Sequence, residues 1–221
     1  MSVRLDPALA HLARADPVLA RLIAGMEEAA LAVVVDPARG GRYPPTHAYG
    51  ALVRVILGQQ VSVGAALAMV ARLAARYDGA LPTPAQILAD DPEALRAAGG
   101  LSRGKLRFVR GLAEEVATGR LDLDALAEAD DETVLATLCA VTGIGPWTAH
   151  VFLMGHLGRP DVLAPGDLGI RRAAGIAYGV DPAPTPDALV AMAEAWRPHR
   201  STACRLLWKS LDVAPTGSGL G

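Results

Sequence analysis

The chain has 221 residues, of which 52% are apolar and only 4% aromatic, and its formal net charge is −2. This length suffices for one medium globular body or two small domains, and the apolar content supports a sizeable core. The charge balance argues against a protein coated in positive charge, although a local basic face can still bind phosphates.

The sequence indicates neither an exported protein nor a metal-cluster protein. The N-terminal segment MSVRLDPALAHLARADP lacks the apolar run of a signal peptide, and the chain has no uninterrupted apolar stretch of about 18 residues. The two cysteines, Cys139 and Cys204, lie in apolar surroundings that are typical of buried thiols in a reducing compartment. Two thiols are too few for a four-cysteine zinc site or an iron–sulfur cluster, so we expect a cytoplasmic protein without either.

Apolar residues recur at helical spacing along nearly the whole chain, which predicts an all-α fold without a fixed-period repeat. Asp16 and Ser62 stand where N-cap residues are expected, and Thr46 is expected to cap the helix between them. We expect a loop over residues 36–45 and a flexible tail over residues 213–221. The predicted helices cover residues 17–35, 46–60, 62–77, 84–89, 92–98, 102–118, 131–141, 147–157, 167–178, 187–196 and 201–211.

The most informative stretch, residues 138–157, reads as a helix, a Gly143-Ile144-Gly145 turn and a second helix. Glycines in such a turn let the backbone take positive φ and approach a ligand closely. The N–H groups in the first turn of the second helix can bind a phosphate without sequence preference. On its own the pattern is also that of an ordinary turn between helices. Likewise Asp167, after Pro165-Gly166, is by local pattern a plain N-cap.

Several motifs accompany the hairpin: ILGQQVSV at residues 56–63, LSRGK at 101–105, the Pro-Gly-Asp ending at Asp167, and WRPHRS at 196–201 followed by Leu207-Trp208. Together with the hairpin they occur in the order found in the helix-hairpin-helix (HhH-GPD) DNA glycosylase superfamily. Over about residues 45–210 the chain resembles the alkyladenine branch of that superfamily, the 3-methyladenine glycosylase II (AlkA-like) type.

The resemblance implies two helical domains flanking a DNA-binding cleft. Residues 45–160 would form the central domain, which carries the hairpin at 138–157. Residues 1–44 would join residues 161–212 in a second domain that carries the catalytic aspartate. Larger enzymes of the branch have an additional N-terminal β-domain, and we expect the minimal form without it.

The resemblance also implies the chemistry. Asp167 would face the extruded nucleotide and stabilise positive charge on an oxocarbenium-like sugar, as an electrostatic stabiliser or as a base for water. Trp147 stands where the bifunctional relatives have a Schiff-base lysine, so water is the expected nucleophile and an abasic site the expected product. Its indole would form a wall that stacks on a cationic alkylated base, although a core tryptophan is the alternative.

Further residues are carried over by the same resemblance. Trp196, His199 and Tyr43 would complete the base pocket, and Gln60 would fill the hole left by the extruded base. Packing within the second domain remains open for Trp196, and a solvated helix end for Gln60. The expected DNA-binding residues are Gly143, Gly145, Pro146, Thr148, Gln59, Gln60, Arg103, Lys105, Arg171 and Arg200; for the basic ones a solvated face is the alternative.

The expected partner is double-stranded DNA containing alkylated bases, bound by a monomer with no membrane association. No cofactor is expected to be required, although the resemblance implies a monovalent cation at the backbone carbonyls of Cys139, Val141 and Ile144. Two alternatives stay open: a glycosylase or lyase for other damaged or mismatched bases, and a non-catalytic helix-hairpin-helix DNA-binding module.

Overall fold

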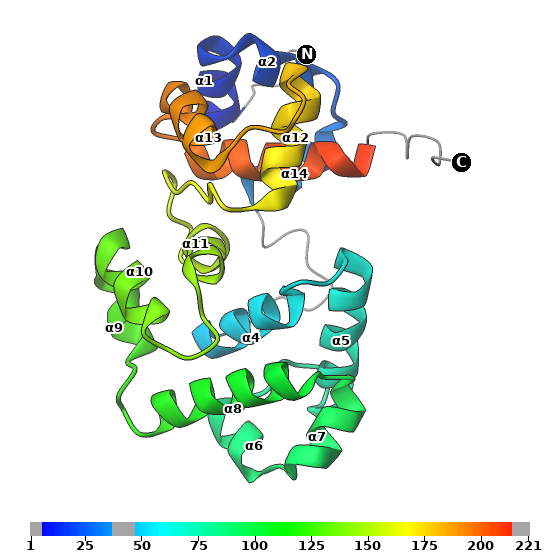
Figure 1. Cartoon of the computed structure of the whole chain (residues 1–221), viewed down its shortest axis with the longest axis vertical. Coiled ribbons are helices and arrows are strands. Elements are labelled where there is room, and N and C mark those ends of the chain that lie inside the picture. The colour runs from blue at the N-terminus through cyan, green and yellow to red at the C-terminus, as the bar shows by residue number, and fades with distance from the viewer. Residues whose placement is uncertain (1–5, 37–46, 214–221) are drawn as a thin grey trace. The chain divides into compact units, whose positions relative to one another are not determined.

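A computed structural model describes residues 6–36 and 47–213, and every regular element in these ranges is helical (Figure 1). The all-α prediction is therefore confirmed. The chain divides into two compact units. The terminal unit combines residues 1–40 with 159–221, and the middle unit comprises residues 41–158. None of the helices in the described ranges has the length and apolar character needed to cross a membrane.

The middle unit is built around helix α4 (Ala48–Gly58), which packs against α5, α8, α9 and α11. The side chains of Leu52, Ile56 and Leu57 on α4 are fully buried by these neighbours. Its other helices are α5 (Val63–Arg76), α6 (Pro84–Ala89), α7 (Pro92–Gly99), α8 (Arg103–Ala117), α9 (Leu123–Glu128), α10 (Asp131–Cys139) and α11 (Pro146–Gly155).

The terminal unit is organised around α14 (Arg200–Val213), which packs against α12, α3, α2 and α1. In Figure 1 this last helix runs across α12. The other elements are α1 (Pro7–Ala15), α2 (Pro17–Ala24), α3 (Glu28–Val35), α12 (Leu168–Tyr178), α13 (Pro186–Ala193) and the 3₁₀ turn η2 (Glu194–Trp196). Both ends of the chain thus share one core.

Most predicted helices are present, but the structure corrects some boundaries. The expected helix over residues 17–35 is two helices, since α2 ends at Ala24 and α3 begins only at Glu28. Two short helices, α1 and α9, were not expected; Asp6 and Asp122 cap them by accepting hydrogen bonds from backbone N–H groups. His47 rather than Thr46 caps α4, with Nδ1 accepting from the Gly50 N–H. Thr46 and residues 214–221 of the predicted tail lie outside the described residues.

One buried carboxylate links several parts of the terminal unit. Asp16 caps α2, with Oδ1 accepting from the N–H groups of Val18 (2.8 Å) and Leu19 (3.2 Å). Its Oδ2 accepts from the indole Nε1 of Trp196 (3.0 Å) and from the Tyr178 hydroxyl. Burial alone would raise the pKa of Asp16, but these hydrogen bonds outweigh it and lower the pKa.

We predict that Asp16→Asn lowers the free energy of unfolding at neutral pH by about 2 kcal/mol, because a charged acceptor with several donors is lost. Urea denaturation measures this loss. The lowered pKa means that the charged carboxylate stabilises the fold above pH ~4 and that its contribution fades as the pH falls through the folded-state pKa. The difference between wild type and variant should therefore shrink on acidification.

Asp6→Asn is the matched control, because Asp6 caps α1 through one backbone hydrogen bond and asparagine caps helices about as well. Equal effects of the two substitutions would show that Asp16 is an ordinary cap.

Candidate active site and DNA-binding hairpin

The hairpin turn is held in place by close packing against α8. Gly143 has φ +92°, and a Cβ at this position would lie 2.2 Å from Cγ of Phe108. Ile144 beside it is only 4% exposed and anchors the turn in the core, whereas Thr142 and Pro146 are exposed. The turn therefore requires glycine at position 143 both for its backbone conformation and for its contact with the ring.

The outer side of the hairpin is the start of α11. Gly145 is its N-cap and has no side chain to cap the first turn, and Pro146 fills the first helical position. A Cβ on Gly145 would meet no atom within 4 Å, and φ there is −107°. This uncluttered helix start suits an anionic group such as a phosphate.

Gln59 ties the hairpin to the end of α4. Its Nε2 donates to the backbone carbonyl of Gly143 (2.9 Å) and to Oγ1 of Thr148 (3.0 Å). The Thr148 side chain is 2% exposed. The Thr148 side chain therefore faces the protein interior, which corrects the prediction that it contacts DNA. The amide nitrogen of Gln59 is likewise used within the protein, in hydrogen bonds to the hairpin.

The Lys105 side chain binds the backbone at the end of α4. Its Nζ donates to three backbone carbonyls at the end of α4, those of Ile56 (2.9 Å), Leu57 (2.6 Å) and Gln59 (2.8 Å). An ammonium group has three donors, and here all of them have partners. The prediction that Lys105 binds phosphate is therefore corrected. Burial lowers the pKa of this amine.

The turn after α4 forms an exposed tip. Gln60 has φ +56°, a left-handed conformation that is uncommon for a residue other than glycine, and it is exposed. Two apolar side chains follow on the surface: Val61 is 39% and Val63 77% exposed. Ser62 caps the next helix, with Oγ accepting from the Ala65 N–H. We call residues 60–63 the exposed tip.

Asp167 lies at the start of α12 with 6% of its surface exposed. Its Oδ1 accepts from the backbone N–H of Ile170 (2.7 Å) and from the indole Nε1 of Trp208 (3.0 Å). A Cβ on Gly169 would lie 3.1 Å from this same oxygen. The carboxylate thus has a fixed orientation, which a helix cap alone would not give it.

Trp208 was not predicted as a site residue. It lies on α14 and is half-buried, and its indole N–H orients Asp167 across a long separation in sequence. The sequence leaves open whether Trp208, in the Leu207-Trp208 pair of the motif, packs the second domain or lines the cleft. The indole N–H of a half-buried tryptophan needs a hydrogen-bond partner, and this need was the signal that could have pointed to Trp208.

The other predicted pocket residues have varied positions. Trp196 is fully buried and bonded to Asp16, so its assignment to a base pocket is corrected: it is a core residue of the terminal unit. His199 packs edge-on against His11, with ring centroids 5.1 Å apart. Trp147 is half-buried in the first turn of α11. Tyr43 lies outside the described residues.

The predicted basic residues fall into those bound to other groups of the protein and those exposed on its surface. Arg200 binds the carboxylate of Asp161 through Nε (2.8 Å) and Nη2 (3.1 Å), and its contact with DNA stays a prediction. Arg171 donates from Nε to the carbonyl of Pro184 (2.6 Å) and holds the loop after α12. Arg103 is exposed at the start of α8. Arg107 is also exposed; it lies over the ring of Phe108, 5.4 Å from its centroid.

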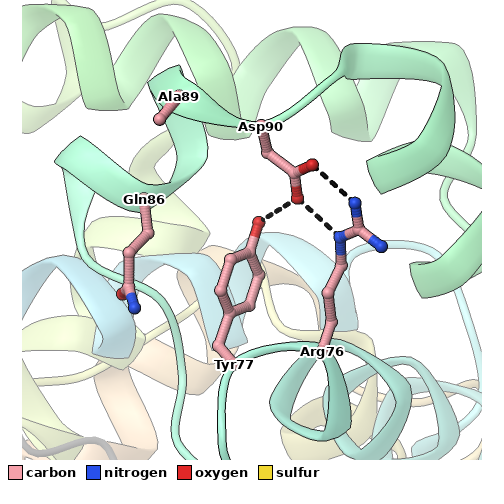
Figure 2. A pocket seen from close by; sticks show the side chains of 5 residues that line it. All are labelled: Arg76, Tyr77, Gln86, Ala89 and Asp90. Carbon is pink, nitrogen blue, oxygen red and sulfur yellow. Dashed lines mark hydrogen bonds and ion pairs between the residues drawn. The ribbon is translucent and has the colours of Figure 1, made fainter.

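A separate polar cluster in the middle unit lies around a surface hollow (Figure 2). Asp90 accepts from Nε and Nη2 of Arg76, both at 2.5 Å, and from the hydroxyl of Tyr77 at 2.6 Å. The hydrogen bonds from Arg76 chiefly hold the pKa of Asp90 low, at about 2. Arg76, Tyr77 and Asp90 are hydrogen-bonded to one another, so the cluster fastens the end of α5 to the end of α6.

The hairpin, the uncapped start of α11 and the helical fold define a class, that of helix-hairpin-helix proteins. Residues 53–198 match the family described as HhH-GPD superfamily base excision DNA repair protein, and the chain belongs to this superfamily.

Relatives support the assignment. A Bacillus subtilis protein named as a DNA-3-methyladenine glycosylase, YfjP, is 30% identical over 170 residues, which cover 74% of this chain and 59% of that relative. DNA-3-methyladenine glycosylase 1 of Schizosaccharomyces pombe is 30% identical over 182 residues, covering 79% of each chain. The structure of S. pombe 3-methyladenine DNA glycosylase (Mag1) in complex with abasic DNA superposes with a TM-score of 0.80, at 27% identity and covering 95% and 98% of the two chains.

We predict that Gly143→Ala lowers the free energy of unfolding by about 2–4 kcal/mol, because a Cβ would strain the backbone and collide with Phe108. Gly145→Ala is the control: with φ −107° and open space around its Cβ, it should change stability by less than about 1 kcal/mol. Chemical denaturation of both variants measures this contrast. Similar values for the two would contradict the packing of the turn on α8.

Proposed function

We propose that this protein is a monofunctional DNA glycosylase that extrudes alkylated purines, such as 3-methyladenine and 7-methylguanine, from duplex DNA and hydrolyses their N-glycosidic bond. An abasic site is the product. The observation that carries the proposal is the buried Asp167 carboxylate, whose Oδ1 is fixed by the Ile170 N–H and the Trp208 indole. The names of the relatives support the same substrate class.

The chemistry follows from charge. As the bond to the base breaks, positive charge develops on the sugar, and a carboxylate held nearby in a fixed orientation stabilises it. The start of α12 favours a negative charge at this position. A cationic alkylated purine is already a good leaving group, so electrostatic stabilisation of the sugar carries much of the reaction without a strong acid.

Water is the nucleophile in this proposal. A lysine amine in the hairpin would form a covalent Schiff base with the sugar, but position 147 is a tryptophan. The half-buried indole of Trp147 offers an electron-rich face on which a cationic base can stack. Hence strand cleavage should not accompany base release.

DNA binding in the proposal relies on the main chain. Gly143, Gly145 and the first turn of α11 hold a phosphate, and the exposed side chain of Arg103 adds charge. The exposed Gln60 enters the base stack. Carbonyls of Cys139, Val141 and Ile144 would hold a monovalent cation. Cys139 is the last residue of α10, where the helix dipole favours positive charge, and Val141 follows the C-cap Ala140. We further propose a cytoplasmic monomer.

Asp167→Asn should slow base release at least about a hundredfold, because the neutral amide no longer stabilises charge on the sugar. Asparagine caps helices well, so the fold and the affinity for DNA should persist. Single-turnover release of 7-methylguanine from a methylated duplex measures the rate.

Asp91→Asn, an exposed N-cap of α7, is the control and should act at the wild-type rate. Near-normal base release by Asp167→Asn would contradict the assignment of Asp167 as the catalytic carboxylate. A wild-type protein that binds the duplex but releases no base would instead support the non-catalytic module.

We also expect borohydride to trap no covalent adduct between the protein and the damaged duplex, because no hairpin amine is available to form an imine. The strand should break only after the abasic product is treated with alkali. A bifunctional glycosylase assayed in parallel shows that trapping works. A protein–DNA band in the borohydride lane would contradict the monofunctional assignment.

A further inference from the structure

We propose that Lys105 and Gln59 form a clamp that fixes the exposed tip (residues 60–63) relative to the hairpin and thereby positions the tip for base extrusion. The inference rests on the proposed glycosylase function and adds two positioning residues to it. Both residues lie in the middle unit, and every contact in the clamp is within that unit.

The first half of the clamp is the ammonium group of Lys105. Lys105 lies in the first turn of α8, where the helix dipole disfavours a cation. Its long side chain carries the charge away to the C-terminal end of α4, where the dipole favours it and the last carbonyls have no partners within the helix. There Nζ binds the carbonyls of Ile56, Leu57 and Gln59 at 2.6–2.9 Å.

The second half is Gln59, the C-cap of α4. Its carbonyl accepts from Lys105, while its side-chain nitrogen donates to Gly143 and Thr148 in the hairpin. One residue therefore joins α8, α4 and α11 immediately before the tip. The next residue, Gln60, has φ +56° and begins the tip directly after these contacts.

A rigid attachment is what extrusion requires. Opening the base stack costs free energy, and the inserting segment must keep its position while the bases separate. The tip has no buried apolar anchor of its own, since Gln60, Val61 and Val63 are all exposed. The tip is attached to α4 on one side and to α5 on the other, where Ser62 caps the helix, and the clamp fixes the α4 side.

The three carbonyls select lysine rather than a generic cation. They converge on one nitrogen, which a tetrahedral ammonium can satisfy with three donors. The planar guanidinium of arginine spreads its donors over a fork and cannot match this arrangement. Lys105→Arg therefore keeps the charge but breaks the clamp, whereas a phosphate contact would survive this change.

The test compares Lys105→Met and Lys105→Arg with wild type on a duplex that holds one 7-methylguanine next to 2-aminopurine. Single-turnover release at saturating protein should fall at least about tenfold in both variants, and the rise in 2-aminopurine fluorescence that reports unstacking should shrink. Affinity for an abasic duplex, and its dependence on salt, should stay within about twofold, since no phosphate contact is lost. Gln59→Leu should lower release similarly, and the double variant should lose little more.

Lys209, the only other lysine in the sequence, supplies the control. It pairs with Asp212 on α14, and Lys209→Met should retain wild-type release and fluorescence.

Three results would overturn the clamp. The first is wild-type release by both Lys105 variants. The second is wild-type release by Lys105→Arg with a reduced salt dependence in Lys105→Met, which would identify a phosphate contact. The third is loss of helicity in both variants at the assay temperature, which would make Lys105 a general fold residue. If wild type itself releases no base, the proposed function fails instead.

Discussion

The packing of the middle unit depends on which groups donate hydrogen bonds to the last backbone carbonyls of α4. A helix leaves its last carbonyls without partners in the helix. At the end of α4 the Gln59 N–H donates to the carbonyl of Ile56, and the exposed tip follows directly. Lys105 supplies the donors from α8, and Gln59 extends the link to the hairpin. Because Gly143 also packs directly on Phe108 of α8, the hairpin is held from two sides, by Gln59 and by Phe108.

Two aspartates of the terminal unit have the same kind of hydrogen-bond arrangement but different roles. Asp16 and Asp167 are both buried N-caps, and each accepts an indole N–H at 3.0 Å, from Trp196 and Trp208 respectively. Asp16 uses both oxygens on donors of the unit itself, and its tryptophan is fully buried, so it stabilises the fold. The tryptophan that holds Asp167 is only half-buried. The surroundings of the indole, rather than the carboxylate alone, distinguish the candidate catalytic group.

Local features could be predicted from the sequence because their causes are local. Apolar spacing gave the helical class, and Ser62 and Ser102 cap α5 and α8 as their residue types suggest. The glycine turn of the hairpin was visible for the same reason. For Trp196 the sequence left both the base pocket and the core open, because its burial depends on Asp16, which lies far away in the sequence. No local pattern separates a tryptophan that lines a pocket from one that fills a core.

Cationic side chains were the hardest to place, since a long flexible stem can reach solvent, a phosphate or a helix end equally well. In a protein with little excess charge, several of them bind groups of the protein itself: Lys105 caps α4, Arg110 binds carbonyls in the last turn and at the C-cap of α6, and Arg200 pairs with Asp161. A basic run in the sequence therefore overstates the charge left for DNA. If the chain binds DNA as proposed, the main-chain donors of the hairpin must carry more of the phosphate binding than the count of arginines suggests.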